Sequence, residues 1–199
     1  MIGVKLTGSA GGVTEPIMPV SEVHLKGAHN IENVLAAVCA ARLAKVSAES
    51  IRASVATFTA VEHRLELVRK LNGVEFYNDS KATNVDATMK AVSSFSKGIH
   101  LILGGKDKDS DYGTMAELLK ERVKAVYTIG SAAEKIERQL HGVVKMVAAG
   151  TMQTAVTEAA KAAAAGDVVL LSPACSSFDQ FENYEHRGRV FRQLVDELI

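Results

Sequence analysis

One stretch of sequence decides the fold class: IHLILGGKDKDSDYGTMAELLKERVKAVYTI, residues 99–129. It begins and ends with a short, largely apolar run, Ile99–Leu103 and Ala125–Ile129, and between these runs apolar residues recur at helical spacing. Short apolar strands that alternate with helices are buried on both faces of a sheet. The stretch therefore predicts an α/β, Rossmann-like domain with a mostly parallel sheet flanked by helices.

The same alternation continues on both sides of this stretch. We predict further strands at residues 65–68, 74–77, 144–148 and 168–171, and helices around residues 85–92, 131–140, 152–165 and 185–198. Ser131 and Glu134 have the spacing of a capping box at the start of the second of these helices.

The first 60 residues have a different pattern of predicted secondary structure. Two helices, at residues 30–44 and 48–58, follow each other with no strand between them, and residues 1–26 read as a hairpin or an irregular edge. We therefore predict a domain boundary near residue 60, which gives domains at residues 1–60 and 61–199.

Composition excludes several classes of protein. The 199 residues include 23 Lys and Arg and 23 Asp and Glu, so the net charge is zero and no overall field favours nucleic acid or an anionic membrane. Cys39 and Cys175 are too far apart in the sequence, and too few, to indicate a zinc site or a disulfide framework. No apolar run approaches the ~18 residues of a membrane span, and no secretory signal begins the chain. We expect a cytoplasmic protein without a metal site of its own.

Three polar loops follow strands of the predicted sheet: NDSKATN (78–84), GGKDKD (104–109) and SPACSS (172–177). Ligands of open α/β sheets bind outside the carboxyl ends of the strands, so these loops carry the functional information. The turns at Gly130-Ser131 and Gly150-Thr151 read as ordinary strand-to-helix turns with a capping residue.

The charged residues of the first two loops are candidate ligands for an anion. Asp79, Lys81 and Thr83 place a charged pair and a hydroxyl directly after a strand. Lys106 and Lys108 follow a Gly-Gly pair that lets backbone approach a phosphate or carboxylate, although these lysines could equally pair with the neighbouring aspartates on the surface.

Other polar residues allow two interpretations. Arg64, at the predicted junction, could clamp a phosphate or form an ion pair within a linker. Asn30 and Asn33, near a helix start, could cap the helix or read an adenine edge. Cys175 reads as structural, because no His lies near it in sequence.

Two nucleotide-binding motifs do not occur in the sequence. Gly105-Lys106 is followed by Asp107, so no P-loop is formed, and no G-x-G-x-x-G follows a strand. A self-sufficient P-loop ATPase and an ordinary NAD-binding domain are both disfavoured.

Four segments together resemble the Mur ligase family, and within it the members that add D-glutamate. They are GAHNIEN (27–33), EHRLE (62–66), NDSKATN (78–84) and SPACSSFDQF (172–181), in the family's order and spacing. The resemblance implies an ATP-dependent ligase of three domains, of which residues 1–60 are the end of the central ATPase domain and residues 61–199 the C-terminal domain. The P-loop and the ligands of Mg²⁺ would lie in the part that precedes this chain.

The resemblance also implies a reaction and its substrates. ATP would convert the carboxylate of UDP-N-acetylmuramoyl-L-alanine to an acyl phosphate, and the amine of D-glutamate would displace the phosphate. Residue by residue, the resemblance assigns adenine to Asn30 and Asn33, ribose to Asp79 and the nucleotide phosphates to Arg64. It assigns D-glutamate to Thr83, Lys108, Ser177 and the backbone of Tyr184, and catalytic charge to Lys81 and Lys108, with Lys106 an alternative to Lys108.

Two other functions remain alternatives. One is an amino-acid or nucleotide binding module without catalysis, and the other is an α/β domain whose polar loops are only turns. By the resemblance, we expect the 199-residue chain alone to be inactive as a ligase.

Overall fold

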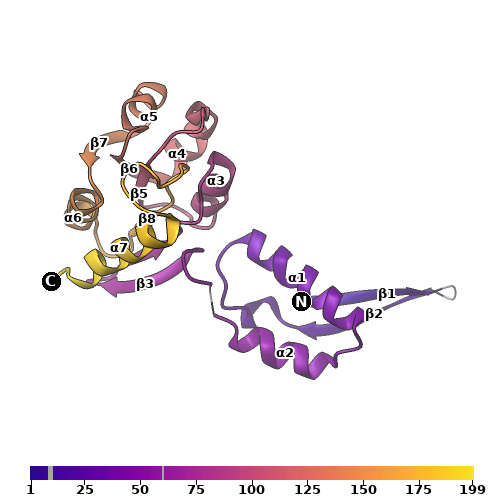
Figure 1. Ribbon diagram of the computed structural model, residues 1–199. Coiled ribbons are helices and arrows are strands. Elements are labelled where there is room, and N and C mark those ends of the chain that lie inside the picture. The colour runs from indigo at the N-terminus through magenta and orange to yellow at the C-terminus, as the bar shows by residue number, and fades with distance from the viewer. Residues whose placement is uncertain (9–10, 60) are drawn as a thin grey trace. The chain divides into compact units, whose positions relative to one another are not determined.

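The computed structural model describes residues 1–8, 11–59 and 61–199 of the chain. They form two compact units, Met1–Ala60 and Val61–Ile199, which we call unit 1 and unit 2 (Figure 1). Ala60, at the predicted boundary, lies outside the described residues. Each unit has its own hydrophobic core, and each is described by itself below.

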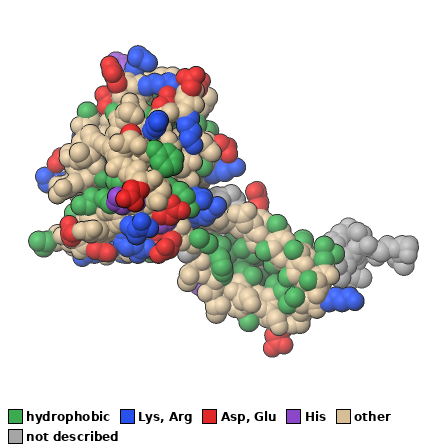
Figure 2. Space-filling model, viewed as in Figure 1, with side chains coloured by type: hydrophobic (Ala, Val, Ile, Leu, Met, Phe, Trp, Pro, Cys, Tyr) green, Lys and Arg blue, Asp and Glu red, His purple; other side chains and the backbone are tan. Residues whose placement is uncertain are grey.

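Unit 1 consists of a β-hairpin and two α-helices. Strands β1 (Ile2–Gly8) and β2 (Gly11–Met18) pair antiparallel, and the short 3₁₀ helix η1 (Val20–Glu22), α1 (Ala28–Leu43) and α2 (Ala48–Thr57) follow. Its core is formed by six buried side chains, Ile2, Ile17, Met18, Val34, Val38 and Ile51. Further hydrophobic side chains gather on the face of unit 1 that Figure 2 shows.

Unit 2 contains a six-stranded sheet in the order β3-β4-β8-β5-β6-β7. β3 pairs antiparallel with β4, and each of the other neighbouring pairs is parallel, which confirms the predicted fold class. The strands are β3 (Glu66–Leu71), β4 (Val74–Asn78), β5 (Ile99–Gly104), β6 (Val123–Ile129), β7 (Lys145–Gly150) and β8 (Val168–Leu171). The helices are α3 (Val85–Ser93), η2 (Tyr112–Met115), α4 (Ala116–Arg122), α5 (Ala133–Gln139), α6 (Met152–Ala162) and α7 (Tyr184–Asp196).

Two hydrophobic layers cover the two faces of this sheet. Side chains of β5 alternate between them: Leu101 and Leu103 pack with α3, α4 and α5, whereas Ile102 packs with α6 and α7. All six residues of β5 are buried, as expected for a central parallel strand between two helical layers. Burial on both faces explains why the strand segments in the sequence are largely apolar and do not alternate with polar residues.

The helix start at residue 131 differs from the prediction. α5 begins at Ala133 with Ala132 in the capping position, and no side-chain cap bond is formed there, so the predicted capping box is wrong. The Ser131 amide donates instead to Asp179 Oδ2 at 2.8 Å. Thr151 behaves as predicted, because its side chain accepts from the Thr154 amide at the start of α6.

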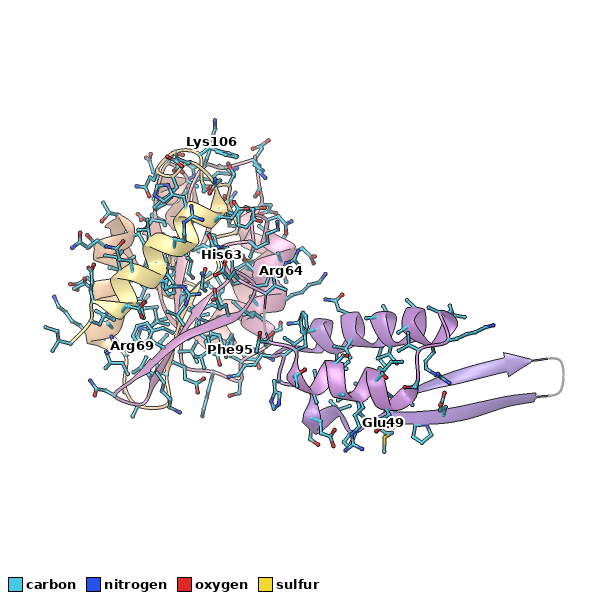
Figure 3. All side chains as sticks on the ribbon, turned by 60° about the horizontal axis from the view of Figure 1, so that its bottom comes forward. Glu49, His63, Arg64, Arg69, Phe95 and Lys106 are labelled. Carbon is cyan, nitrogen blue, oxygen red and sulfur yellow. The ribbon has the colours of Figure 1, made fainter. Side chains whose placement is uncertain are left out.

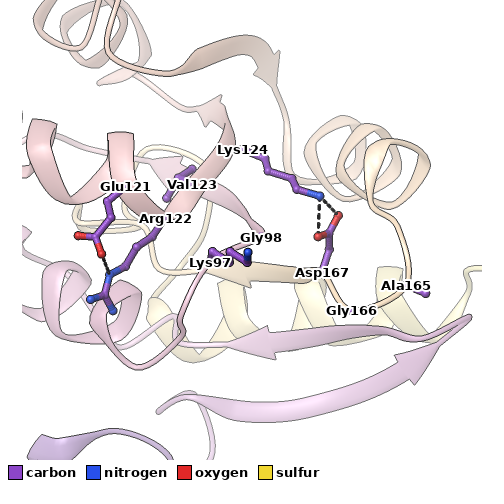
Figure 4. A pocket seen from close by; sticks show the side chains of 9 residues that line it. All are labelled: Lys97, Gly98, Glu121, Arg122, Val123, Lys124, Ala165, Gly166 and Asp167. Carbon is purple, nitrogen blue, oxygen red and sulfur yellow. Dashed lines mark hydrogen bonds and ion pairs between the residues drawn. The ribbon is translucent and has the colours of Figure 1, made fainter.

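At the amino ends of the strands, the buried carboxylate of Asp167 accepts hydrogen bonds from residues of neighbouring segments (Figure 4). Lys124 Nζ lies 2.7 Å and 2.8 Å from the two oxygens of Asp167, which also accepts from the Ala164 amide at 2.9 Å. His100 lies 3.0 Å, through Nδ1, from the Tyr127 hydroxyl and 3.4 Å, through Nε2, from Asp167 Oδ2, and its burial lowers its pKa. The imidazole is therefore neutral and hydrogen-bonded, in a structural role.

Arg69 is expected to stabilise the end of the last helix of unit 2. Its Nη1 lies 3.0, 3.0 and 2.9 Å from the carbonyl oxygens of Val195, Asp196 and Leu198, where a cation offsets the unpaired acceptors of a helix end. Arg69→Ala should lower the free energy of unfolding by about 1–2 kcal/mol. Thermal melting measures this loss, and an unchanged Tm would contradict it.

Candidate functional site

The three polar loops leave neighbouring strands at one edge of the sheet. β4, β8 and β5 lie side by side and parallel, so their carboxyl ends meet at that edge. The loops after them, residues 79–84, 172–183 and 105–111, are therefore adjacent, as the alternation in sequence predicts. We call this edge, with its three loops, the carboxyl edge.

The loop after β5 is joined to the loop after β8 by backbone hydrogen bonds. The Lys106 amide donates to Ser176 O at 2.9 Å, and Ser176 Oγ donates to Lys106 O at 3.1 Å. Gly105 permits this approach, because a Cβ at its φ of +137° would lie 2.3 Å from Ser176 O. The close backbone approach expected at the Gly-Gly pair is thus made to another loop of the protein.

The lysines of the β5 loop are exposed, and the flanking acids do not neutralise them. Lys135 Nζ, on α5, lies 2.7 Å from Asp107 Oδ2 and 3.2 Å from Asp109 Oδ1. Neither Lys106 nor Lys108 forms an ion pair with any residue that the structure describes. The interpretation in which these two lysines pair with the neighbouring aspartates is therefore wrong.

A partly buried network of hydrogen bonds anchors the β5 loop. Burial alone would raise the pKa of Asp107, but hydrogen bonds from Lys135, Tyr112 and a backbone amide outweigh it and hold that pKa at about 2. The Tyr112 hydroxyl also lies 2.9 Å from Cys175 Sγ. Burial raises the pKa of Cys175 to about 11, so the thiol is protonated at neutral pH and has a structural role, as the sequence predicts.

Asp79 is buried at the carboxyl edge between two donors. Its Oδ1 accepts from the Leu65 amide at 3.1 Å, and its Oδ2 accepts from Ser172 Oγ at 2.9 Å. Burial raises the pKa of Asp79 to about 7, although both hydrogen bonds and the charge of Arg64 oppose that rise. The carboxyl group therefore changes its charge close to neutral pH.

Lys81 is held by the start of the last helix. Its Nζ lies 2.8 Å from the Tyr184 hydroxyl and 4.0 Å from the centroid of the same ring. Ser80 Oγ donates to Tyr184 O at 2.8 Å, which fixes the backbone at this point. Asn183 caps the helix through its side chain, so the Tyr184 amide is one of the donors that a helix start leaves without an intrahelical partner.

Thr83 and Ser177 lie on two of the three loops of the carboxyl edge. Thr83 is half-buried, two residues after Lys81. Ser177 is 2% exposed, and its carbonyl oxygen accepts from the Phe181 amide at 2.9 Å, so the segment after it turns back on itself. Both hydroxyl residues belong to loops anchored by backbone hydrogen bonds.

Arg64 is exposed at the start of unit 2, next to buried His63 (Figure 3). His63 and Leu65 have φ values of +66° and +43°, a left-handed conformation that non-glycine residues rarely adopt. Asn78 Nδ2 donates to His63 Nδ1 at 2.9 Å and helps to hold this turn. Arg64 forms no ion pair within the described part of the chain, which excludes the ion pair within a linker.

Asn30 and Asn33 belong to unit 1. Both lie inside α1, whose capping residue is Gly27 and has no side-chain cap bond, so neither amide caps the helix. Asn30 Nδ2 donates to Lys26 O at 2.7 Å, and Asn33 Nδ2 to Asn30 Oδ1 at 3.5 Å. The interpretation of these residues as helix caps is therefore wrong, and their contact with adenine stays a prediction.

Sequence reasoning missed Arg187, the largest fully buried side chain of the chain as described. It lies on α7 and donates to oxygen atoms of both the β4 loop and the β8 loop. One signal was present in the sequence: Arg187 precedes Phe191 and Val195 by four and eight residues, which puts it on the apolar face of the helix.

Two features are absent from the described residues. No described helix combines the length and apolar character that crossing a membrane requires. Within the same residues, no three side chains of His, Cys, Asp or Glu are grouped so that they could hold a metal ion.

Comparisons with known proteins agree with this architecture. The family model described as "Mur ligase, glutamate ligase domain" matches residues 63–175. The UDP-N-acetylmuramoylalanine–D-glutamate ligase of Acidobacterium capsulatum is 70% identical over 182 residues, which are 92% of this chain and 40% of that protein. The enzyme of the same name from Koribacter versatilis is 61% identical over 182 residues, again 92% of this chain and 40% of the relative. The chain thus spans about two fifths of the length of these relatives.

Solved structures share the fold at low sequence identity. A pseudomurein peptide ligase type C from Methanothermus fervidus has a TM-score of 0.66 at 18% identity and covers 98% of this chain and 40% of its own. The MurF ligase of Thermotoga maritima in complex with ADP has a TM-score of 0.58 at 16% identity, over 86% of this chain and 39% of its own. By its sequence match and its fold, the chain belongs to the Mur ligase family, and its residues 63–175 form the glutamate ligase domain.

Proposed function

We propose that this chain supplies the D-glutamate site and part of the nucleotide site of a UDP-N-acetylmuramoylalanine–D-glutamate ligase. In this proposal unit 1 is the end of the central ATPase domain, unit 2 is the C-terminal domain, and the reaction belongs to cytoplasmic peptidoglycan precursor synthesis. The observation that carries it is the 70% identity to a ligase of that name over 92% of this chain.

The carboxyl edge has the donors that D-glutamate requires. The substrate has two carboxylates, and an ammonium group, two hydroxyls and a helix-start amide are suitable partners for them. In this proposal these are Lys108, Thr83, Ser177 and the Tyr184 backbone. Two observations support the assignment. Lys108 is exposed and forms no ion pair with the described residues, and the segments that carry Thr83, Ser177 and Tyr184 are anchored by backbone hydrogen bonds.

The proposed nucleotide contacts are taken residue by residue from the family resemblance. Asn30 and Asn33 would hold adenine, Asp79 the ribose and Arg64 the phosphates. An exposed guanidinium without an ion-pair partner among the described residues suits a phosphate, and a carboxyl with two occupied oxygens still has lone pairs for a ribose hydroxyl. We assign no ligand of Mg²⁺ to this chain.

The proposed reaction requires a positive charge at the carboxyl edge. ATP would phosphorylate the alanyl carboxylate, and the D-glutamate amine would attack that carbon, lose a proton and expel phosphate. Negative charge gathers near the attacked carbon, and a fixed cation offsets it. In this proposal Lys81 supplies that charge, and the hydrogen bond of 2.8 Å from its Nζ to the Tyr184 hydroxyl supports a fixed position for the ammonium group.

The first experiment tests whether the three loops bind D-glutamate or are only turns of the fold. We expect D-glutamate, added to the isotope-labelled 199-residue chain, to move NMR signals of residues 79–84, 105–111 and 172–183, with weak affinity. L-glutamate should move them less, because the same donors meet its carboxylates in the wrong arrangement. Equal, non-saturating shifts with both enantiomers would contradict the proposal.

The second experiment separates a ligase from a binding module. We expect the 199-residue chain alone to release no phosphate from ATP in the presence of both substrates. A chimera, in which the upstream part of the Acidobacterium capsulatum relative precedes this chain, should turn over. A chimera that binds D-glutamate and ATP but forms no product would favour the binding module.

A further inference from the structure

We infer that Arg187 is a positioning residue for the proposed D-glutamate site: its guanidinium holds the loop with Lys81 and Thr83 against the loop with Ser177. The inference rests on the proposed function, because it concerns the geometry of that site. Arg187 is 0% exposed, so it touches no substrate and can act only through the loops that it joins.

The guanidinium contacts one loop through a pair of hydrogen bonds. Arg187 Nε donates to Ser80 Oγ at 2.9 Å, and Nη2 donates to Ser80 O at 2.8 Å. Ser80 lies between Asp79 and Lys81, both residues of the proposed site. The bidentate contact therefore fixes the loop backbone between Asp79 and Lys81.

The remaining nitrogen contacts the other loop. Arg187 Nη1 lies 3.1 Å from Cys175 O and 3.3 Å from Ser176 O, directly before Ser177. A Cβ at Gly105 would lie 3.1 Å from the same nitrogen, so the β5 loop also packs against the guanidinium. All three loops of the carboxyl edge thus meet at one side chain.

The chemistry of these contacts favours positioning over charge pairing. Every acceptor of Arg187 is a carbonyl or a hydroxyl, and no described carboxylate lies within ion-pair distance of it. A buried charge is costly unless its donors are all used, and the planar fork of arginine matches acceptors in two directions at once. A lysine keeps the charge, but its ammonium cannot span both loops.

The hydrogen bonds of Arg187 also connect, through Ser80, to the start of α7. Ser80 Oγ, which accepts from Arg187, donates to Tyr184 O at 2.8 Å, and the Tyr184 hydroxyl holds Lys81. A shift of the guanidinium would therefore move the helix-start amide together with Lys81. The positions of the proposed D-glutamate ligands therefore all depend on the position of the Arg187 guanidinium.

The test is a D-glutamate titration of the 199-residue chain and its Arg187→Lys variant, followed by NMR well below the Tm of each. We expect Arg187→Lys to raise the Kd by about tenfold. Arg69→Lys is the matched control, because Arg69 also binds carbonyl oxygens in unit 2 but at the end of α7. The control should keep the Kd within about twofold of wild type.

Two results of the comparison between Arg187→Lys and its control would overturn the inference. One is a Kd of Arg187→Lys equal to that of wild type, and the other is an equal weakening by Arg69→Lys, which would show that lost stability alone weakens binding. If Arg187→Lys does not fold, Ser80→Ala removes one acceptor of Arg187 and should raise the Kd by about threefold, whereas an unchanged Kd would overturn the inference. A wild-type chain that does not bind D-glutamate would instead overturn the proposed function, and with it this inference.

Discussion

Asp79→Asn is expected to remove a large pH-dependent contribution to the stability of unit 2. The pKa of Asp79 is raised to about 7 by burial, against an ordinary value of 3.8. Between these values the folded chain holds a proton that the unfolded chain has lost, so the free energy of unfolding of the wild type falls as pH rises. Because one pKa unit corresponds to about 1.4 kcal/mol, the contribution is about 4 kcal/mol across this range.

The measurement is denaturant unfolding of wild type and Asp79→Asn at several pH values between 4 and 8. Asparagine has the same shape, its oxygen can accept from the Leu65 amide, and it does not titrate. The difference in unfolding free energy should therefore shift by about 4 kcal/mol in favour of the variant as pH rises from 4 to 8. Parallel pH profiles of the two proteins would show that Asp79 has an ordinary pKa.

Lys108→Ala is expected to raise the KM for D-glutamate by about ten- to a hundredfold in the chimera that places this chain after the upstream part of its relative. The reason is that an ammonium paired with a substrate carboxylate acts on that substrate alone. The KM for ATP should stay within about twofold, because the proposed nucleotide contacts lie on other residues.

Lys106→Ala is the matched control for this measurement. Lys106 lies on the same loop, is also exposed and is also without an ion pair among the described residues, so its side chain differs from that of Lys108 mainly in the assigned role. Its backbone already binds Ser176, and its side chain is not needed for that contact. A selective effect of Lys106→Ala, with none for Lys108→Ala, would show that the assignment within the loop is reversed.

Much of the fold follows from local patterns in the sequence. The runs at Ile99–Leu103 and Val168–Leu171 are too short for helices and too apolar for exposed strands, so a buried parallel sheet is the arrangement that satisfies both. The start of α6 was predictable as well, because the cap at Thr151 is a contact within four residues. Patterns of this kind depend on near neighbours, which the sequence displays directly.

Predictions that depend on a distant partner were less reliable. The Ser131 amide binds Asp179, 48 positions away, and this contact replaces the expected capping box. Asp107 and Asp109, on the β5 loop, pair with Lys135 of α5 and not with the lysines beside them in sequence. In each case a partner that tertiary folding brings close displaced the local one.

The sequence by itself determined the α/β class, the three polar loops at the carboxyl edge and the family resemblance that the comparisons confirm, because strand periodicity and motif spacing are properties of a linear string. Only the tertiary structure decided that the lysines of the β5 loop have no ion-pair partner among the described residues, that Asp79 is buried, and that Arg187 joins the loops. The physical reason is that charge pairing, desolvation and bidentate hydrogen bonding depend on distances between residues up to about a hundred positions apart, and folding alone sets those distances.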